Sequence, residues 1–301
     1  MILENKNYTL PNFLIVGAQK AATSSIFDIL NQHSEIYLPP EKEVHFFDYP
    51  EKIKQGIGYY ARYFQHAGNA KAIGEASPSY LFYPEVSKQI KHILGTDLKI
   101  IILLRDPADR AFSHYKMMYM NGHEKRPFST VIDENLKSLQ HRINFDRVTS
   151  YLDRSLYAFQ IKNYMDIFPP ENLKFILFEE DFVQTRKKTI LEVQQFLGVT
   201  EEDISVNIKT FPTVIRRSNK VDTILNTGNT INQFFKRIIP SKNIRMLTKY
   251  YMNEINSKPV MINDDFKSYK PMLVRDVFYR DIKETEGLIK RDLSRWYKDY
   301  I

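Results

Sequence analysis

The stretch that decides the fold is Phe13–Phe27, which reads FLIVGAQKAATSSIF. Four apolar residues followed by Gly17 predict a buried strand that ends in a tight turn. The pattern after the turn predicts a helix over 23–32. A helix that begins directly after a strand presents free backbone N–H groups and the positive end of its dipole, which together favour an anion. The sequence therefore predicts a strand, a phosphate-sized loop and a helix.

The loop departs from the ordinary phosphate-binding loop, G-x-x-x-x-G-K-[ST]. Counted from Gly17, Ala22 stands at the second glycine, Thr23 at the lysine and Ser24 at the hydroxyl position. The lysine of the stretch comes earlier, at Lys20. We therefore expect a phosphate-like group here, but not ATP with magnesium held in the usual way. The plainer alternative is a common turn with a solvated Lys20.

Composition places the chain among ordinary globular proteins, with 301 residues, 43% hydrophobic and 26% charged. The net charge of +7 suits an anionic ligand, although it is spread along the chain. The absence of cysteine excludes disulfides, a thiolate nucleophile and zinc–thiolate sites. We see no secretory leader and no apolar run of about 18 residues, so we expect a cytoplasmic protein without a transmembrane segment.

Further apolar runs alternate with helical patterns. The run 99–104 is apolar throughout after Lys99 and predicts a central parallel strand, and 174–178 predicts another. This alternation predicts an α/β fold with a doubly wound parallel sheet. Two amphipathic stretches within 274–296 predict a C-terminal helical hairpin that folds back on the core. The remaining helices are expected at 84–94, 108–120, 158–168 and 186–196, the last stopped by Gly198.

A second candidate phosphate site is Arg105–Tyr115, RDPADRAFSHY. Arg105 lies at the predicted carboxyl end of a strand, where open α/β sheets bind ligands. Asp106 can cap the next helix, and Ser113 falls about two turns into it. An arginine fork and a hydroxyl could hold a second phosphate. The alternative is an ion pair between Arg105 and an aspartate, with Ser113 facing solvent.

A candidate acid–base pair lies in 41–47, EKEVHFF. In an extended segment Glu43 and His45 face the same side, where a carboxylate beside an imidazole could accept a proton. The alternative is a polar edge strand before the apolar pair that follows. The stretch 74–80, GEASPSY, indicates only a loop.

Together these motifs resemble the sulfotransferase family that uses 3′-phosphoadenosine 5′-phosphosulfate (PAPS), most closely its carbohydrate or heparan-type branch and bacterial relatives. The resemblance covers roughly residues 11–200 and implies a P-loop-like parallel sheet flanked by helices. We interpret 1–301 as a single domain, with 11–200 as the PAPS-binding core and 201–301 as a helical extension. The segments that carry the resemblance are 19–24, 43–47, 74–78, 105–115, 155–157 and 168–198.

The resemblance implies transfer of the sulfuryl group from PAPS to a hydroxyl, or less readily an amine, by in-line displacement without a metal. Lys20 would stabilise the charge on the leaving phosphate, Glu43 would act as the base, and His45 would either orient Glu43 or replace it as the base. The expected cofactor-binding residues are Gln19, Lys20, Ala21, Ala22, Thr23, Ser24, Arg105, Ser113, Tyr157, Arg216 and Arg217.

The sequence leaves the acceptor open among a saccharide, a glycolipid and a small natural product, and leaves the oligomeric state open. Ala21 and Ala22 stand where the family often has glycine, and Ala76 stands where some heparan enzymes carry lysine. Two other functions compete. One is an ATP-dependent P-loop kinase. The other is a nucleic-acid-binding module, suggested by the positive charge with 20 Phe and 19 Tyr, but no basic stripe with interleaved aromatics supports a nucleic-acid partner.

Overall fold

The structure is a computed structural model of the 301-residue chain. Side chains are described from Tyr8 onward, and only the backbone is described for the short strands at 2–3, 6–7, 214–216 and 257–259. The described residues are 2–3, 6–139, 146, 148–207, 214–216, 257–259 and 265–301.

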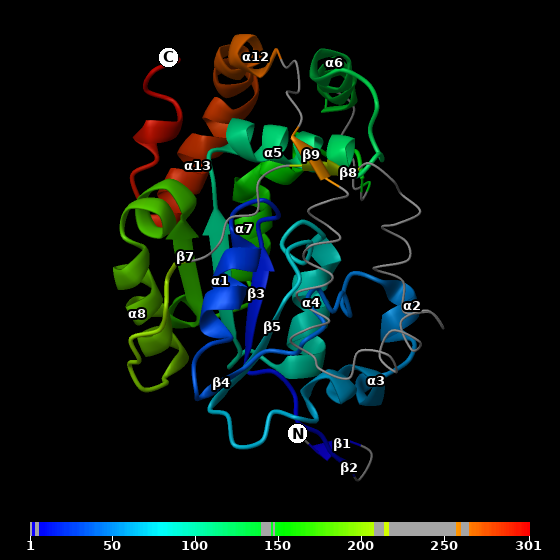
Figure 1. The fold of residues 1–301 in the computed structure, drawn as a ribbon, viewed down its shortest axis with the longest axis vertical. Coiled ribbons are helices and arrows are strands. Elements are labelled where there is room, and N and C mark those ends of the chain that lie inside the picture. The colour runs from blue at the N-terminus through cyan, green and yellow to red at the C-terminus, as the bar shows by residue number, and fades with distance from the viewer. Residues whose placement is uncertain are drawn as a thin grey trace.

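A sheet of five parallel strands forms the centre of the molecule, in the order β4–β5–β3–β6–β7 (Figure 1). Its middle strand is β3 (Phe13–Gly17), which pairs with β5 (Ala72–Ala76) on one side and β6 (Lys99–Leu104) on the other. The edge strands are β4 (Ile36–Tyr37) and β7 (Leu173–Leu177). Every residue of β3 is buried, as expected of a strand covered on both faces. The predicted parallel α/β sheet is confirmed.

The strand β5 corrects the expectation of a loop over 74–80. Its sequence, AIGEA, has little strand propensity of its own. The strand forms because it lies between β4 and β3, with Gly74 paired to Phe13. A Cβ atom at Gly74 would overlap the ring of Phe13, so the glycine permits the close approach of the two strands.

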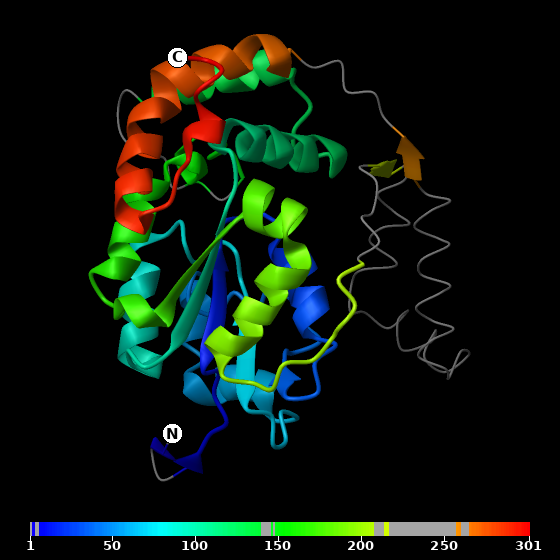
Figure 2. The ribbon, with the colours of Figure 1, turned by 90° about the vertical axis from the view of Figure 1, so that its left-hand side faces the viewer.

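Helices cover both faces of the sheet, with α1 and α8 on one face and α4 and α7 on the other (Figure 2). The expected helix α4 has the bounds that the sequence predicts, and α8 ends where Gly198 adopts a φ of 76°. The five helices expected within the core are α1 (Thr23–Leu30), α4 (Pro84–Leu94), α5 (Pro107–Met120), α7 (Tyr157–Met165) and α8 (Arg186–Leu197).

Further elements lie outside this core. The further helices and helical turns are α2 (Pro50–Ile53), α3 (Ile57–Ala61), η1 (Arg62–Phe64), α6 (Phe128–Leu139), η2 (Asp153–Ser155), η3 (Pro170–Asn172) and η4 (Phe178–Gln184). Two antiparallel strand pairs lie outside the main sheet, β1 (Ile2–Leu3) with β2 (Lys6–Asn7) and β8 (Val214–Arg216) with β9 (Ser257–Pro259).

The expected C-terminal helical hairpin is wrong in its second arm. The chain is helical without a break through α12 (Phe266–Met272), the π-helical turn η5 (Leu273–Phe278) and α13 (Tyr279–Ile289). It then turns at Lys290 and returns with only a short 3₁₀ turn, η6 (Ser294–Trp296). Two apolar residues three positions apart, Leu293 and Trp296, fit a 3₁₀ turn as well as an α-helix, so their spacing misled the prediction. The segment still packs on the core, because its buried side chains join the hydrophobic cluster of the sheet.

Candidate active site

The loop after β3 uses left-handed backbone at two residues that are not glycine. Lys20 has a φ of 74° and Ala22 a φ of 72°, and Ala22 is the residue from which α1 begins. This conformation costs about 1–3 kcal/mol per residue and persists only where the surroundings hold it. The first turn of α1 contains no acidic residue, and no side chain caps it. Its N–H groups therefore remain available to an anion.

The side chain of Lys20 lies among other cations. Burial lowers the pKa of Lys20, and the charges of Arg105 and Arg110 lower it further. The charge of Glu43 opposes these effects and raises the pKa. The loop is also tied to the end of β6, because Arg105 Nη1 donates to the carbonyl of Lys20 at 3.2 Å. The structure thus brings Lys20, Arg105 and Glu43 into one region.

The arginines beside this loop bond to neutral partners. Arg110 is fully buried and donates to Ser155 Oγ at 2.6 Å, to the carbonyl of Gln19 at 3.4 Å and to the carbonyl of Tyr151. The guanidinium of Arg105 packs over a phenyl ring at 4.7 Å, and its buried Nε has no hydrogen-bond partner. Within the described chain, neither arginine forms an ion pair. Buried positive charge without a carboxylate is costly unless an anion compensates it.

Two more polar groups in this region lack partners. The Oε1 atom of Gln19 is buried without a hydrogen bond, and both ring nitrogens of the buried His114 are unpartnered. Burial, Arg110 and the other nearby cations hold the pKa of His114 well below its usual range, so the imidazole is neutral. Sequence reasoning passed over Arg110 and His114, because both lie inside a helical pattern that explains them as ordinary surface or core residues.

The alternative of an Arg105–aspartate ion pair is wrong. Asp106 instead caps α5 by accepting from the N–H groups of Ala108 and Asp109, and it pairs with Lys270 at 2.9 Å. Ser113 lies on the same helix and is half-buried. The capped start of α5 therefore fixes the segment that joins Arg105 to Ser113.

The structure places the other predicted cofactor-binding residues at different depths. Tyr157 is fully buried, and its hydroxyl donates to the carbonyl of Arg105 at 2.9 Å, so it holds the backbone that directly follows β6. Ala21 is buried in the loop, and Thr23 is buried at the first position of α1. Arg216 ends β8, of which only the backbone is described, and Arg217 lies outside the described residues.

The predicted acid–base pair is brought together, but not on a strand. The segment around Glu43 and His45 is irregular, with φ of 63° at Glu43 and 53° at His45, so the extended segment expected for the pair and the alternative of a polar edge strand are both wrong. The His45 Nε2 atom lies 3.2 Å from Glu43 Oε2. On its other side, Nδ1 lies 2.9 Å from Asp48 Oδ2. Asp48, whose side chain is fully buried, is a third member that the sequence reading missed.

This geometry places a charged imidazole between two carboxylates. Burial alone would lower the pKa of His45, but the hydrogen bonds to Asp48 and Glu43 outweigh it and raise the pKa to about 9. Burial likewise opposes ionisation of Glu43, but the His45 hydrogen bond and the charge of Lys42 prevail and lower its pKa. At neutral pH His45 therefore donates to both carboxylates.

A further cation, Lys42, connects the two halves of the site. Its Nζ donates to Ser24 Oγ at the start of α1 and lies 3.8 Å from Glu43 Oε1. Burial lowers the pKa of Lys42, and the charge of Glu43 opposes this effect. The loop-and-helix start that follows β3 and the segment that carries Glu43 and His45 thus share a direct contact.

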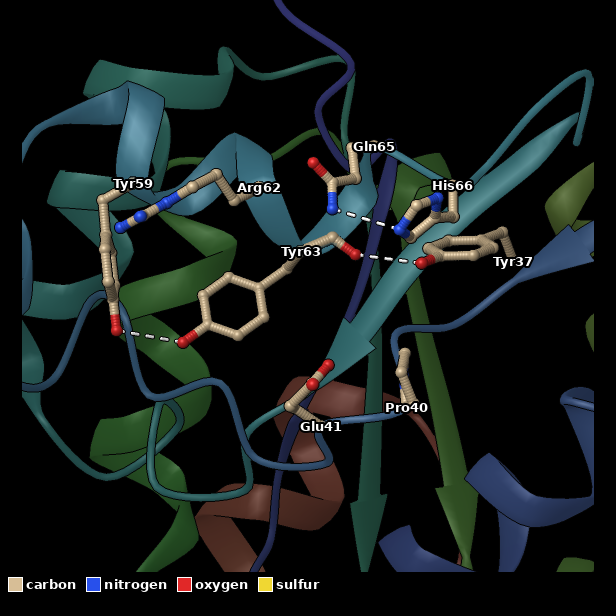
Figure 3. A pocket seen from close by; sticks show the side chains of 8 residues that line it. All are labelled: Tyr37, Pro40, Glu41, Tyr59, Arg62, Tyr63, Gln65 and His66. Carbon is tan, nitrogen blue, oxygen red and sulfur yellow. Dashed lines mark hydrogen bonds between the residues drawn. The ribbon is translucent and has the colours of Figure 1, made fainter. Parts of the chain in front are cut away.

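An aromatic pocket of about 470 Å³ adjoins the segment that carries Glu43 and His45, because Glu41 is one of its lining residues. As Figure 3 shows, Tyr37 donates to the carbonyl of Tyr63 at 3.0 Å, and the hydroxyls of Tyr63 and Tyr59 lie 3.0 Å apart. The guanidinium of Arg62 covers the ring of Tyr59 at 4.7 Å. The lining residues are Tyr37, Pro40, Glu41, Tyr59, Arg62, Tyr63, Gln65 and His66.

No group of three or more histidine, aspartate or glutamate side chains among the described residues is arranged to hold a metal ion. No helix in the same residues is long and apolar enough to cross a membrane.

The fold and the site define an α/β protein of the P-loop-like class, with a cluster of cations near the carboxyl edge of its sheet. The chain belongs to the sulfotransferase family, because the family described as "Sulfotransferase domain" matches residues 10–256. A crystal structure of a sulfotransferase from Alicyclobacillus acidocaldarius is similar over 96% of this chain and 99% of that one, with a TM-score of 0.67 and 29% identity.

Curated relatives also match. Heparan sulfate glucosamine 3-O-sulfotransferase 5 of Mus musculus is 26% identical over 191 residues, which are 63% of this chain and 54% of the relative. Bifunctional heparan sulfate N-deacetylase/N-sulfotransferase 3 of Homo sapiens is 31% identical over 209 residues, which are 63% of this chain and 22% of the relative. The chain thus spans about half of the first relative and about a fifth of the second.

The raised pKa of His45 predicts a specific loss of stability at alkaline pH. Because the folded-state pKa of about 9 lies above the ordinary value of 6.5, the stabilisation is complete below pH 6.5 and is lost as the pH rises toward 9. The free energy of unfolding of wild type, relative to His45→Gln, should therefore fall between these values, by at most about 1.4 kcal/mol per pH unit. Urea unfolding at a series of pH values measures it.

Asp48→Asn provides the matched comparison, because it removes one of the two carboxylates and keeps the shape of the side chain. The NMR titration midpoint of His45 should fall in this variant. A wild-type midpoint at or below 6.5 would contradict the assignment of a charged imidazole.

Proposed function

We propose that this protein transfers the sulfuryl group of PAPS to a hydroxyl, or less readily an amine, of a saccharide or glycoconjugate. The observation that carries the proposal is a group of cations, Lys20, Arg105 and Arg110, that form no ion pair within the described residues and lie near the Glu43–His45 pair. Membership of the sulfotransferase family supports PAPS as the donor.

The residues present suit a donor that carries phosphates at two ends. The free N–H groups at the start of α1 and the ammonium of Lys20 would hold the 5′-phosphosulfate. Arg105, whose Nε has no partner, and Ser113 would hold the 3′-phosphate. When bound, PAPS supplies a sulfuryl group on a stabilised phosphate leaving group.

Lys20 would stabilise the negative charge that develops on the leaving phosphate. A cation in a half-buried site acts more strongly than one in water, because fewer water molecules screen it. Lys42 lies between Ser24 and Glu43. Its positive charge there would reduce the repulsion between the carboxylate of Glu43 and the negatively charged donor.

At neutral pH Glu43, and not His45, is the group that can accept the proton of the acceptor. His45 already carries its proton, because its pKa is about 9, and both ring nitrogens donate to carboxylates. The lowered pKa of Glu43 keeps this carboxylate ionised, so that it can accept a proton. Asp48 would hold the imidazolium in the orientation that points Nε2 at Glu43.

The aromatic pocket supports a saccharide as the acceptor. Its tyrosine rings offer flat apolar faces, and Arg62 and Gln65 offer hydrogen-bond donors, a combination that suits a sugar ring. The pocket reaches Glu41, and the two residues of chain from Glu41 to Glu43 span at most about 7 Å. An extended acceptor with a hydroxyl at Glu43 would therefore place its neighbouring unit in this pocket. The names of the heparan sulfate relatives agree with such an acceptor.

Removal of either reacting side chain should abolish most of the transfer. Lys20→Ala should lower kcat on the order of 100- to 1,000-fold, because it removes a charge aimed at the leaving group. Glu43→Gln should lower it on the order of 100- to 10,000-fold, because the amide cannot accept the proton. The assay follows label from PAPS into acceptor, with Lys187→Ala, an exposed lysine on α8, as control. Wild-type turnover in both active-site variants would refute these roles.

The expected 3′-phosphate clamp predicts a preference for adenosine 3′,5′-bisphosphate (PAP) over AMP. In calorimetry, wild type should bind PAP more tightly, and Arg105→Ala should lose roughly tenfold or more in PAP affinity while AMP affinity changes little. Arg275→Ala, which alters an exposed arginine paired with Asp276, is the control. The clamp is refuted if wild type binds the two nucleotides equally.

The pocket predicts a dependence on acceptor length. Tyr63→Ala should raise the KM for a heparan-backbone hexasaccharide roughly three- to tenfold through loss of ring contact, without a change in the KM for PAPS. The corresponding disaccharide should be unaffected. Phe159→Ala, which removes an exposed ring on α7, serves as control. An identical KM for the hexasaccharide in Tyr63→Ala and wild type would rule the pocket out as a subsite.

A further inference from the structure

We infer that Glu75, a buried carboxylate on β5, is a positioning residue that holds the backbone beneath Glu43 and His45 in its active shape. The inference rests on the proposed function for its effect on the reaction. Glu75 is 1% exposed and lies one residue before the end of β5, so it touches neither donor nor acceptor. It acts through hydroxyl groups that contact the neighbouring loop.

Three hydroxyls converge on this carboxylate. Ser77 Oγ donates to Glu75 Oε2 at 2.6 Å. The hydroxyls of Tyr80 and Tyr60 donate to Glu75 Oε1 at 2.8 and 3.0 Å. Burial raises the pKa of Glu75, and the three hydroxyl hydrogen bonds and the charge of His45 oppose that rise. Each donor turned toward the carboxylate favours its ionised form.

Two of these hydroxyls also hold the catalytic segment. The backbone N–H of His45 donates to Ser77 Oγ at 2.9 Å, and that of Phe46 donates to Tyr80 OH at 2.7 Å. A backbone N–H can only donate, so each hydroxyl must accept there and point its single proton elsewhere. Glu75 is the acceptor that receives both protons. Glu75 thereby fixes the direction of two hydrogen-bond chains, which end on the backbone N–H groups of His45 and Phe46.

The segment around Glu43 and His45 needs this support because its backbone is strained. Glu43 and His45 both have left-handed φ values, 63° and 53°, which cost about 1–3 kcal/mol each for residues other than glycine. Lys52 Nζ donates to the carbonyl of Val44 at 2.5 Å and holds the residue between them. The two hydrogen-bond chains from Glu75 hold the backbone N–H groups of the same turn, and the rigid strand β5 supports these chains.

Tyr80 and Tyr60 form a matched pair for the test. Both are fully buried, and both donate to the same oxygen of Glu75. Only Tyr80 also accepts from Phe46. Replacement of either by phenylalanine removes one hydroxyl and keeps the ring.

Tyr80→Phe should lower kcat roughly tenfold to a hundredfold, since a misplaced base loses its alignment, while the KM for PAPS and the affinity for PAP stay within twofold. Amide hydrogen exchange at Phe46 should accelerate on the order of tenfold, because its N–H loses its partner. Tyr60→Phe should keep kcat and Phe46 exchange within twofold of wild type. Ser77→Ala gives the same test at the amide of His45, should Tyr80→Phe fail to fold.

Equal losses of kcat in the two tyrosine variants would overturn the inference, because they would show a general role in stability. Wild-type kcat and wild-type exchange at Phe46 in Tyr80→Phe would overturn it as well. If wild type transfers no sulfuryl group to any acceptor, the proposed function fails, and the exchange comparison alone decides whether Glu75 holds the loop.

Discussion

Three cations that form no ion pair within the described chain, Lys20, Arg105 and Arg110, dominate this site. Arg110 is buried and bonds only to neutral groups, Arg105 leaves its Nε without a partner, and Lys20 has its pKa lowered by burial and by both arginines. Buried charge of this kind is costly unless another interaction compensates it, and under the proposed function that interaction is an anionic ligand. The left-handed loop and the uncapped start of α1 add N–H donors to the same place.

Negative charge is gathered on the opposite side of the site. Glu43 and Asp48 enclose the imidazolium of His45, and Glu75 lies buried beneath the same turn. Lys42 connects the two sides, because it donates to Ser24 and lies 3.8 Å from Glu43. The separation suits the proposed group transfer, in which a donor held among the cations would meet an acceptor whose proton would move to a carboxylate. Both sides depend on the parallel sheet, since the loops that carry them follow β3, β4 and β6.

The sequence predicts those parts of the structure that short-range physics controls. The strands β3 and β6 are continuous apolar runs, and α5 has its cap and proline in place, so their existence and bounds follow from pattern alone. The strand β5 and the partners Asp48 and Glu75 could not be predicted, because their roles arise from contacts between segments. Neither the left-handed Ala22 nor the left-handed His45 has a local signal, because such backbone normally selects glycine.

A crystal structure with PAP bound tests the central claim most directly. The account predicts the 5′-phosphate on the N–H groups that open α1, beside Lys20, and the 3′-phosphate against Arg105 and Ser113. It also predicts that Glu43 faces the vacant side of the 5′-phosphate, where an acceptor would enter. Phosphates located away from both Lys20 and Arg105, or those two side chains turned into separate cavities, would contradict it.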